Sequence, residues 1–169
     1  MLLEKADKLA GHVKEALAPF CDQIEIVGSV RRRRPVVNDL DLVCLPKLGE
    51  FHALRARVLE KTYLVLDGAE NLIVRQHVTH FQIDIFVARP TERDLFQSKP
   101  GNFGSLLICR TGSKEHNIYL VETAKRAGLR WNPYYGVYDG HGHCIAAETE
   151  ADIFRALGLD FIPPEKRER

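Results

Sequence analysis

The chain has 169 residues, of which 45% are hydrophobic and 28% are charged, and its net charge is +1. This composition is typical of a globular protein, and no apolar run is long enough to cross a bilayer. A protein that binds nucleic acid over its whole surface is usually more basic, so any such binding must come from local patches.

The first ninety residues predict an α+β fold, with a mixed or antiparallel sheet and helices on one face. Apolar residues recur at three- and four-residue spacing from Leu2 to Leu17, which predicts a helix that ends near Pro19. A second helix is expected over 50–60. Strands are expected over 23–27, 40–45, 62–66, 71–78 and 81–88, and the stretch DGAEN predicts a hairpin between the third and the fourth.

The remaining residues predict a small α/β subdomain. Helices are expected over 102–109, 114–127 and 150–157. Ser113 and Thr149 suit the N-caps of the last two, and Gly128 and Gly158 suit their C-terminal stops. A hairpin is expected over 134–138 and 143–146 around DGHG, and the tail PPEKRER is expected to be frayed. We therefore predict two domains, 1–90 and 91–169.

The stretch NDLDLV places two carboxylates within a predicted strand. Residues i and i+2 of a strand face the same side, so Asp39 and Asp41 project together while Leu40 and Leu42 point into the core. Two buried carboxylates repel each other, and a divalent cation such as Mg²⁺ relieves this repulsion. The alternative is that the pair lies solvated in a turn or at a strand edge, as most such pairs do.

Asp84 lies between Ile83 and Ile85 in another strand, and an acid in a buried strand needs a reason. If this strand lies beside that of Asp39 and Asp41, three carboxylates meet. That arrangement suits two-metal phosphoryl transfer, in which one metal activates a hydroxyl and the other holds a triphosphate.

The stretch GSVRRRR precedes these acids and suggests an anion site. Gly28 allows close approach of the backbone to a ligand, and Ser29 is expected to cap a helix whose amides face an anion. Arg31 and Arg32 then lie within reach of a triphosphate. Four consecutive arginines cannot all point one way, so part of this block is expected to face solvent.

Other polar and aromatic residues favour structural roles. The group His141, His143 and Cys144 suggests zinc, but it lies in a predicted turn without a fourth ligand nearby. Trp131, with the tyrosines after it, suits packing on a helix better than stacking on bases. The four cysteines form no CxxC pair, so buried thiols in a reducing compartment are expected, with Cys109 among them.

Four segments, GSVRRRRPVVNDLDLV, FGSLLICRTGSKEHN, AKRAGL and ADIFRALGLDFIPPEKRE, resemble the palm and C-terminal subdomain of family X DNA polymerases. The resemblance covers nearly the whole chain, and the TGSKEHN segment and the ending are its most specific parts. It implies a nucleotidyltransferase palm over 1–90, in a minimal form that begins one helix before Gly28 and leaves no room for the lyase and fingers domains.

The resemblance also implies a role for each matching residue. Asp39, Asp41 and Asp84 would bind Mg²⁺, which Mn²⁺ could replace, and Asp84 would accept the proton of the primer 3′-hydroxyl. The residues implied in nucleotide binding are Gly28, Ser29, Arg32, Asn38, Cys109, Arg110, Gly112 and Asn117. The implied partners are primer-template or gapped DNA and dNTPs, with no membrane, and the protein is expected to be a cytoplasmic monomer or a viral protein acting in the host cytoplasm.

Several positions depart from the family pattern. Cys109 and Arg110 replace the pair usually found near the sugar, and Val121 replaces a common template-reaching arginine. The interpretation is a DNA polymerase that fills short gaps or processes ends in DNA repair, with reduced template and sugar selection. Two alternatives stay open: a nucleotidyltransferase acting on a non-DNA hydroxyl, and a non-catalytic module that binds DNA ends.

Overall fold

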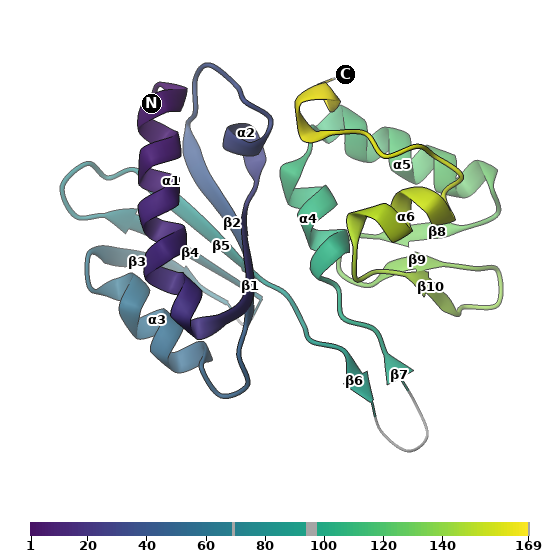
Figure 1. Ribbon diagram of the computed structural model, residues 1–169, viewed down its shortest axis with the longest axis horizontal. Coiled ribbons are helices and arrows are strands. Elements are labelled where there is room, and N and C mark those ends of the chain that lie inside the picture. The colour runs from purple at the N-terminus through teal and green to yellow at the C-terminus, as the bar shows by residue number, and fades with distance from the viewer. Residues whose placement is uncertain (69, 94–97, 169) are drawn as a thin grey trace. The chain divides into compact units, whose positions relative to one another are not determined.

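The computed structural model describes residues 1–68, 70–93 and 98–168. The chain divides into two compact units, Met1–Ala88 and Arg89–Arg169, which we call the N-terminal and the C-terminal unit (Figure 1). Across the described ranges, no helix combines the length and the apolar character that crossing a membrane requires.

The N-terminal unit is built on a five-stranded sheet in the order β1-β2-β5-β4-β3. Strands β2 and β5 are parallel and all other neighbours are antiparallel, so the predicted α+β fold with a mixed sheet is confirmed. Its elements are α1 (Leu3–Leu17), the 3-10 turn η1 (Ala18–Phe20), β1 (Cys21–Ile26), α2 (Gly28–Arg31), β2 (Asp39–Pro46), α3 (Phe51–Leu59), β3 (Thr62–Asp67), β4 (Asn71–Gln76) and β5 (Gln82–Val87).

Helices α1 and α3 cover one face of this sheet (Figure 1). Leu40 and Leu42 of β2 are fully buried there, together with Ile85 of β5, against Ala10 of α1 and Leu54 of α3. The alternation along β2 and β5 therefore sends the leucines and isoleucines to the core, as predicted, and the residues between them to the other face.

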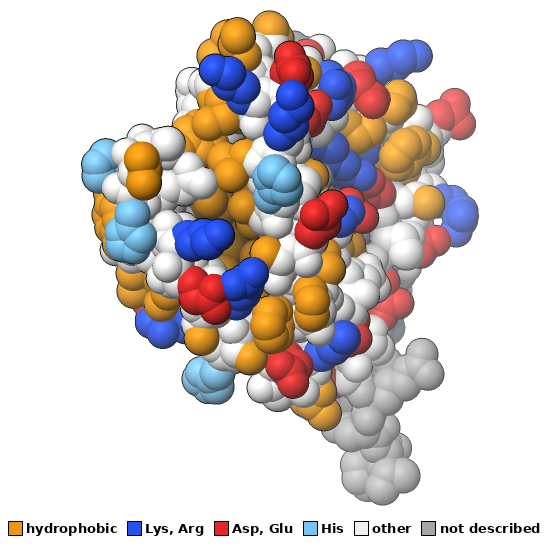
Figure 2. Space-filling view, turned by 60° about the vertical axis from the view of Figure 1, so that its left-hand side comes forward, with side chains coloured by type: hydrophobic (Ala, Val, Ile, Leu, Met, Phe, Trp, Pro, Cys, Tyr) orange, Lys and Arg blue, Asp and Glu red, His pale blue; other side chains and the backbone are white. Residues whose placement is uncertain are grey.

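The edge of the sheet at β3 is unusually apolar. Tyr63, Leu64, Val65 and Leu66 are all exposed there, and a cavity of about 340 Å³ lies between α1, the end of α3 and the strands. Figure 2 shows hydrophobic side chains gathered on this side of the molecule among basic and histidine side chains. The predicted DGAEN hairpin joins β3 to β4, although Ala69 lies outside the described residues.

The C-terminal unit contains three helices and short strands. Its elements are β6 (Glu92–Arg93), β7 (Ser98–Lys99), α4 (Phe103–Thr111), α5 (Lys114–Arg126), β8 (Arg130–Asn132), β9 (Gly136–Tyr138), β10 (Cys144–Ala146), α6 (Glu150–Ala156) and the 3-10 turn η2 (Pro164–Lys166). Sheet β10-β9-β8 has one strand more than the predicted hairpin, because Trp131 of β8 is buried in the core with Leu120 and Phe154. The β6–β7 pair was not predicted.

The predicted helix ends are confirmed in this unit. The Ser113 hydroxyl accepts the N–H of His116 at 3.2 Å, and the Thr149 hydroxyl accepts the N–H of Asp152 at 3.1 Å. Gly128 follows α5 with a φ of 69°, a conformation in which a side chain would be strained.

The prediction of a frayed tail is wrong. Arg167 is fully buried, and its Nη1 lies 2.8 Å from the Glu150 carboxylate, while its Nε donates to the carbonyl of Ile162. The Arg167 carbonyl in turn accepts the Ser113 hydroxyl at 2.7 Å. Polar residues at the end of a chain usually stay in water, but here Arg167 ties the tail to the start of α6 through its guanidinium and to the start of α5 through its backbone carbonyl.

Candidate active site

The three aspartates lie on the sheet face opposite α1 and α3. Asp41 of β2 and Asp84 of β5 are register partners across the parallel pair. Asp39, two residues before Asp41, is paired in the same way with Gln82. Side chains of register partners point to the same side of a sheet, so all three carboxylates share one face. Each of them is half-buried.

Gly28 brings the backbone of α2 against Asp41. A Cβ on Gly28 would stand 2.0 Å from Oδ2 of Asp41, which is far closer than atoms can approach. Gly28 also has a φ of 62°, and the N–H of Val27 donates to the Asp41 carbonyl at 2.9 Å. The predicted need for glycine here therefore has a specific cause: the space that a side chain would fill holds a carboxylate.

Asp84 is held by its neighbours on the same face. Nε2 of Gln82 donates to Oδ1 of Asp84 at 2.9 Å, and Arg75 of β4 reaches Oε1 of Gln82 at 3.4 Å. The neutral amide of Gln82 therefore helps to orient Asp84, and Arg75 contacts the oxygen of the same amide.

The carboxylates fit Mg²⁺ in chemistry, because oxygen ligands on one face are what this cation prefers. No three His, Cys, Asp or Glu side chains of the described residues are gathered closely enough to form a preformed metal cluster. The three aspartates therefore share one face of the sheet without forming such a cluster.

The segment that was predicted to bind an anion differs in one detail from its prediction. Ser29 does not cap α2, because the helix begins at Gly28 and Val27 is its N-cap. The Ser29 hydroxyl is instead buried, with no hydrogen-bond partner among the described residues. A buried hydroxyl without a partner is costly, so an acceptor supplied by a ligand would suit this position.

The arginine block divides, as expected. Arg33 has a φ of 61° and turns toward α1, where its Nη1 lies 2.6 Å from Oδ2 of Asp7. Arg32 is the C-cap of α2 and is half-buried, and Asn38 is exposed just before β2. Arg33 therefore holds α1 through an ion pair. Arg32 and Asn38 instead lie in the segment that joins α2 to β2, the strand that carries Asp39 and Asp41.

The predicted nucleotide-contacting residues of the C-terminal unit lie together around the end of α4. Nδ2 of Asn117 donates to the carbonyl of Cys109 at 2.8 Å, and the Gly112–Ser113 peptide bond is cis. Nη2 of Arg110 lies 2.5 Å from the hydroxyl of Tyr134, and its guanidinium lies over that ring. The contact between Arg110 and Tyr134 was not predicted, because it joins distant parts of the chain.

The Cys109 thiol is half-buried, and burial raises its pKa, although the nearby Arg110 charge acts in the opposite direction. The thiol is therefore neutral near pH 7 and suits packing better than nucleophilic chemistry. Cys109 and the other three cysteines are free thiols.

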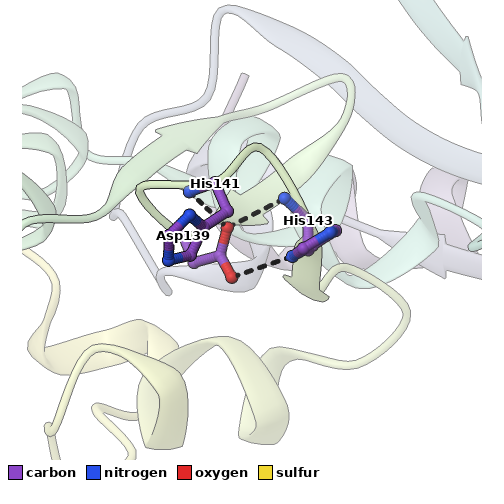
Figure 3. A network of polar contacts seen from close by, with 3 residues as sticks. All are labelled: Asp139, His141 and His143. Carbon is purple, nitrogen blue, oxygen red and sulfur yellow. Dashed lines mark hydrogen bonds and ion pairs between the residues drawn. The ribbon is translucent and has the colours of Figure 1, made fainter.

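The histidines of the β9–β10 turn are organised by Asp139 (Figure 3). One Asp139 oxygen accepts the backbone N–H groups of His141 and His143, both at 2.9 Å, and the other lies 3.3 Å from Nδ1 of His143. These backbone hydrogen bonds lower the pKa of Asp139. The turn is explained by this carboxylate, and no metal-binding cluster is found here among the described residues.

Comparisons by sequence and by structure both match this chain to polymerases. Residues 106–168 match the family model described as DNA polymerase beta thumb. The chain is 28% identical over 163 residues to the DNA polymerase/3′-5′ exonuclease PolX of Bacillus subtilis (strain 168), covering 95% of this chain and 27% of that protein. It is 25% identical over 203 residues to the human DNA-directed DNA/RNA polymerase mu, covering 99% of this chain and 41% of that protein.

The chain is a relative of the family X DNA polymerases. Its fold agrees with this relationship, since a ternary P/T complex of Leishmania infantum polymerase beta superposes with a TM-score of 0.77. That match is 17% identical in sequence and covers 100% of this chain and 77% of the other. The chain spans well under half the length of the two family X relatives matched in sequence, so their full activities do not pass to it directly.

Proposed function

We propose that this chain is a DNA polymerase of the family X type, which joins a nucleotide to a DNA 3′-hydroxyl and releases pyrophosphate. The observation that carries the proposal is the register pairing of Asp41 with Asp84 on parallel strands, with Asp39 next to them on the same face. The relationship to PolX and polymerase mu supports the same reaction class. Short gap filling and end processing in DNA repair are the tasks that we propose for it.

Each part of the site has a chemical role in this proposal. Asp39, Asp41 and Asp84 would hold Mg²⁺, or Mn²⁺ in its place, which when bound supplies stabilisation of the charge on the reacting oxygens. Asp84, oriented by Gln82, accepts the proton of the attacking hydroxyl. Gly28 keeps the backbone close to Asp41 without displacing its carboxylate.

The remaining residues would hold the incoming nucleotide. The unpartnered hydroxyl of Ser29 donates to a phosphate oxygen, and Arg32 neutralises the triphosphate with help from the amide of Asn38. In the C-terminal unit, Cys109 and Gly112 would line the sugar, and Asn117 would reach the minor-groove edge of the base. A further part of this proposal is that Arg110, held by Tyr134, also lines the sugar.

The test is addition of one labelled nucleotide to a DNA with a one-nucleotide gap, in the presence of Mg²⁺. We expect Asp84→Asn to lower the rate by at least about a thousandfold, or roughly 4 kcal/mol in the barrier, with triphosphate binding largely retained. The matched control is Asp67→Asn, which makes the same change on β3, where the aspartate pairs with Arg55. Near-normal turnover of Asp84→Asn would remove the proposed site.

The same assay separates the alternatives. Transfer to RNA, to a small molecule or to a protein hydroxyl in place of DNA would indicate a nucleotidyltransferase of another specificity. DNA binding without any transfer would indicate a non-catalytic module.

A further inference from the structure

A cavity of about 890 Å³ lies within the C-terminal unit, and none of its lining residues belongs to the candidate active site. Two cations, Arg89 and Lys99, line it together with Tyr135, Tyr138 and His143. The described part of the lining contains no carboxylate. Its volume is in the range of sites that hold small ligands, and its charge favours an anion.

Arg89 is fixed in place before any ligand arrives. Its Nη2 donates to the carbonyl of Tyr134 at 2.6 Å, and its guanidinium lies 4.9 Å from the centre of the Tyr135 ring. Its backbone N–H donates to Oδ1 of Asn102 at 2.7 Å. A cation held in one position loses little conformational entropy when it binds a phosphate.

Arg89 also has unused hydrogen-bonding capacity. Its Nε is buried and has no hydrogen-bond partner in the described ranges. A buried donor of this kind is unfavourable until an acceptor reaches it, and a phosphate oxygen is such an acceptor.

Tyr135 supplies an aromatic surface in the same cavity. Its side chain is 50% exposed, so the Arg89 guanidinium covers only part of it. An exposed ring beside a fixed cation is typical of proteins that bind single-stranded nucleic acids, because a base stacks on the ring while a backbone phosphate pairs with the cation.

The β9–β10 turn places a third nitrogen donor at the cavity. Asp139 holds the backbone of this turn and lies beside Nδ1 of His143, as Figure 3 shows. With Nδ1 facing Asp139, Nε2 is the ring nitrogen of His143 that is left for a ligand.

We propose that this cavity binds single-stranded DNA, with one phosphate against Arg89, Lys99 and His143 and one base on Tyr135. The cavity and its chemistry stand on the lining residues alone, whereas the choice of DNA among phosphate-bearing aromatic ligands rests on the proposed function. A nucleotide that is not paired in a duplex is the unit that offers both groups, because its base is free to leave the stack.

The test uses the full chain with EDTA, so that no nucleotide is added during the measurement. Binding of a labelled oligodeoxythymidylate of about ten nucleotides is followed by fluorescence anisotropy. Tyr135→Ser should weaken binding about tenfold, whereas Tyr135→Phe, which keeps the ring, should leave binding unchanged. An abasic oligonucleotide of equal length should bind the wild type and Tyr135→Ser equally, because no base remains to stack.

Lys99→Glu tests the phosphate contact. It should reduce the magnitude of the slope of log K against log salt by about one. The matched control is Lys5→Glu, which makes the same change at an exposed position on α1 and should reduce that magnitude less. Equal binding of the oligodeoxythymidylate by wild type and Tyr135→Ser would overturn the proposal, and so would equal effects of Lys5→Glu and Lys99→Glu on the salt slope.

Competing ligands separate the possible sources of the phosphate. Displacement of the oligonucleotide by inorganic phosphate or dTMP at equal nucleotide concentration would show a site for free anions or nucleotides and would overturn the assignment to a DNA strand. If the wild type binds the oligonucleotide as expected but adds no nucleotide to gapped DNA with Mg²⁺, the polymerase proposal is overturned and the binding site is not.

Discussion

Acidic side chains are used differently in the two units. In the N-terminal unit, Asp39, Asp41 and Asp84 share a sheet face and remain half-buried. In the C-terminal unit, Glu150 is 8% exposed and pairs with Arg167, which is fully buried. One arrangement gathers like charges beside one another, and the other places a single charge against its opposite.

The difference shows how charge can serve either chemistry or stability. Like charges on one face destabilise a fold, and under the proposed function a bound cation offsets this cost. A buried pair with further hydrogen bonds fixes the geometry of the segments that it joins, and its loss leaves an unpaired buried charge. Substitutions in the first group should therefore change activity, and substitutions in the second should change stability.

Arg167→Met should produce the largest effect on stability. It leaves Glu150 buried without its partner, so we expect the C-terminal unit to lose about 3–5 kcal/mol of unfolding free energy. Denaturant titration followed by the fluorescence of Trp131 measures this, because that residue is the one tryptophan of the chain and is buried in this unit.

The matched control is Arg155→Met, which removes a pair with Asp152 whose side chains are 77% and 45% exposed. Exposed pairs contribute little, so its cost should stay below about 1 kcal/mol. Equal losses in the two variants would contradict the assignment of the Arg167 pair as a structural centre.

Gly28→Ala should act on activity in the other unit. Its Cβ would displace the Asp41 carboxylate, and a misplacement of about 1 Å at a reacting site can lower the rate about a hundredfold. Single-nucleotide addition measures the change. Gly49→Ala is the control, since Gly49 also has a positive φ, 81°, but nothing lies within 4 Å of its added Cβ. If both variants lose the same activity, backbone strain and not the carboxylate is responsible.

Selection of the incoming nucleotide should be weak. Val121 packs against the core of the C-terminal unit and offers no charge to a template strand, so we expect the preference for the correct dNTP to be about 1–3 kcal/mol smaller than with a template-contacting side chain there. Under the proposed function, in which Cys109 and Arg110 line the sugar, we expect slow, error-prone addition and measurable use of the matching rNTP. Each dNTP and the rNTP are supplied separately on a one-nucleotide gap. Rejection of all incorrect substrates by several orders of magnitude would contradict this interpretation.

The smallest effect is expected at a helix cap. Thr149→Ala removes the hydroxyl that accepts the Asp152 N–H at the start of α6, which should cost about 1 kcal/mol. Thr123→Ala, in the interior of α5, is the control and should change stability by less than about 0.5 kcal/mol. Thermal unfolding of both variants tests this, and equal shifts in Tm would show that the cap is not needed.

The sequence was most informative where a short-range pattern decides the structure. Alternation in β2 and β5 placed Leu40 and Leu42 in the core, and local capping chemistry placed Ser113 and Thr149. These features depend on neighbours within a few residues, which a single sequence displays.

Features made by distant residues could not be predicted. The buried pair of Arg167 with Glu150 and the contact of Arg110 with Tyr134 depend on the folded C-terminal unit. Ser29 was misplaced as a cap because α2 begins two residues earlier than that cap implies, at Gly28, which has a positive φ and lies close to Asp41. Local rules do not include such approaches between elements.

The parallel pairing of β2 with β5 has a consequence for how the protein folds. These strands are far apart in the sequence, and β3 and β4 lie between them in the chain. The antiparallel meander of β3, β4 and β5 forms from near neighbours, whereas its joining to β2 requires closure of a long loop, which is slower. The shared face of Asp41 and Asp84 therefore depends on a pairing that closes a long loop, and the local meander alone does not create it.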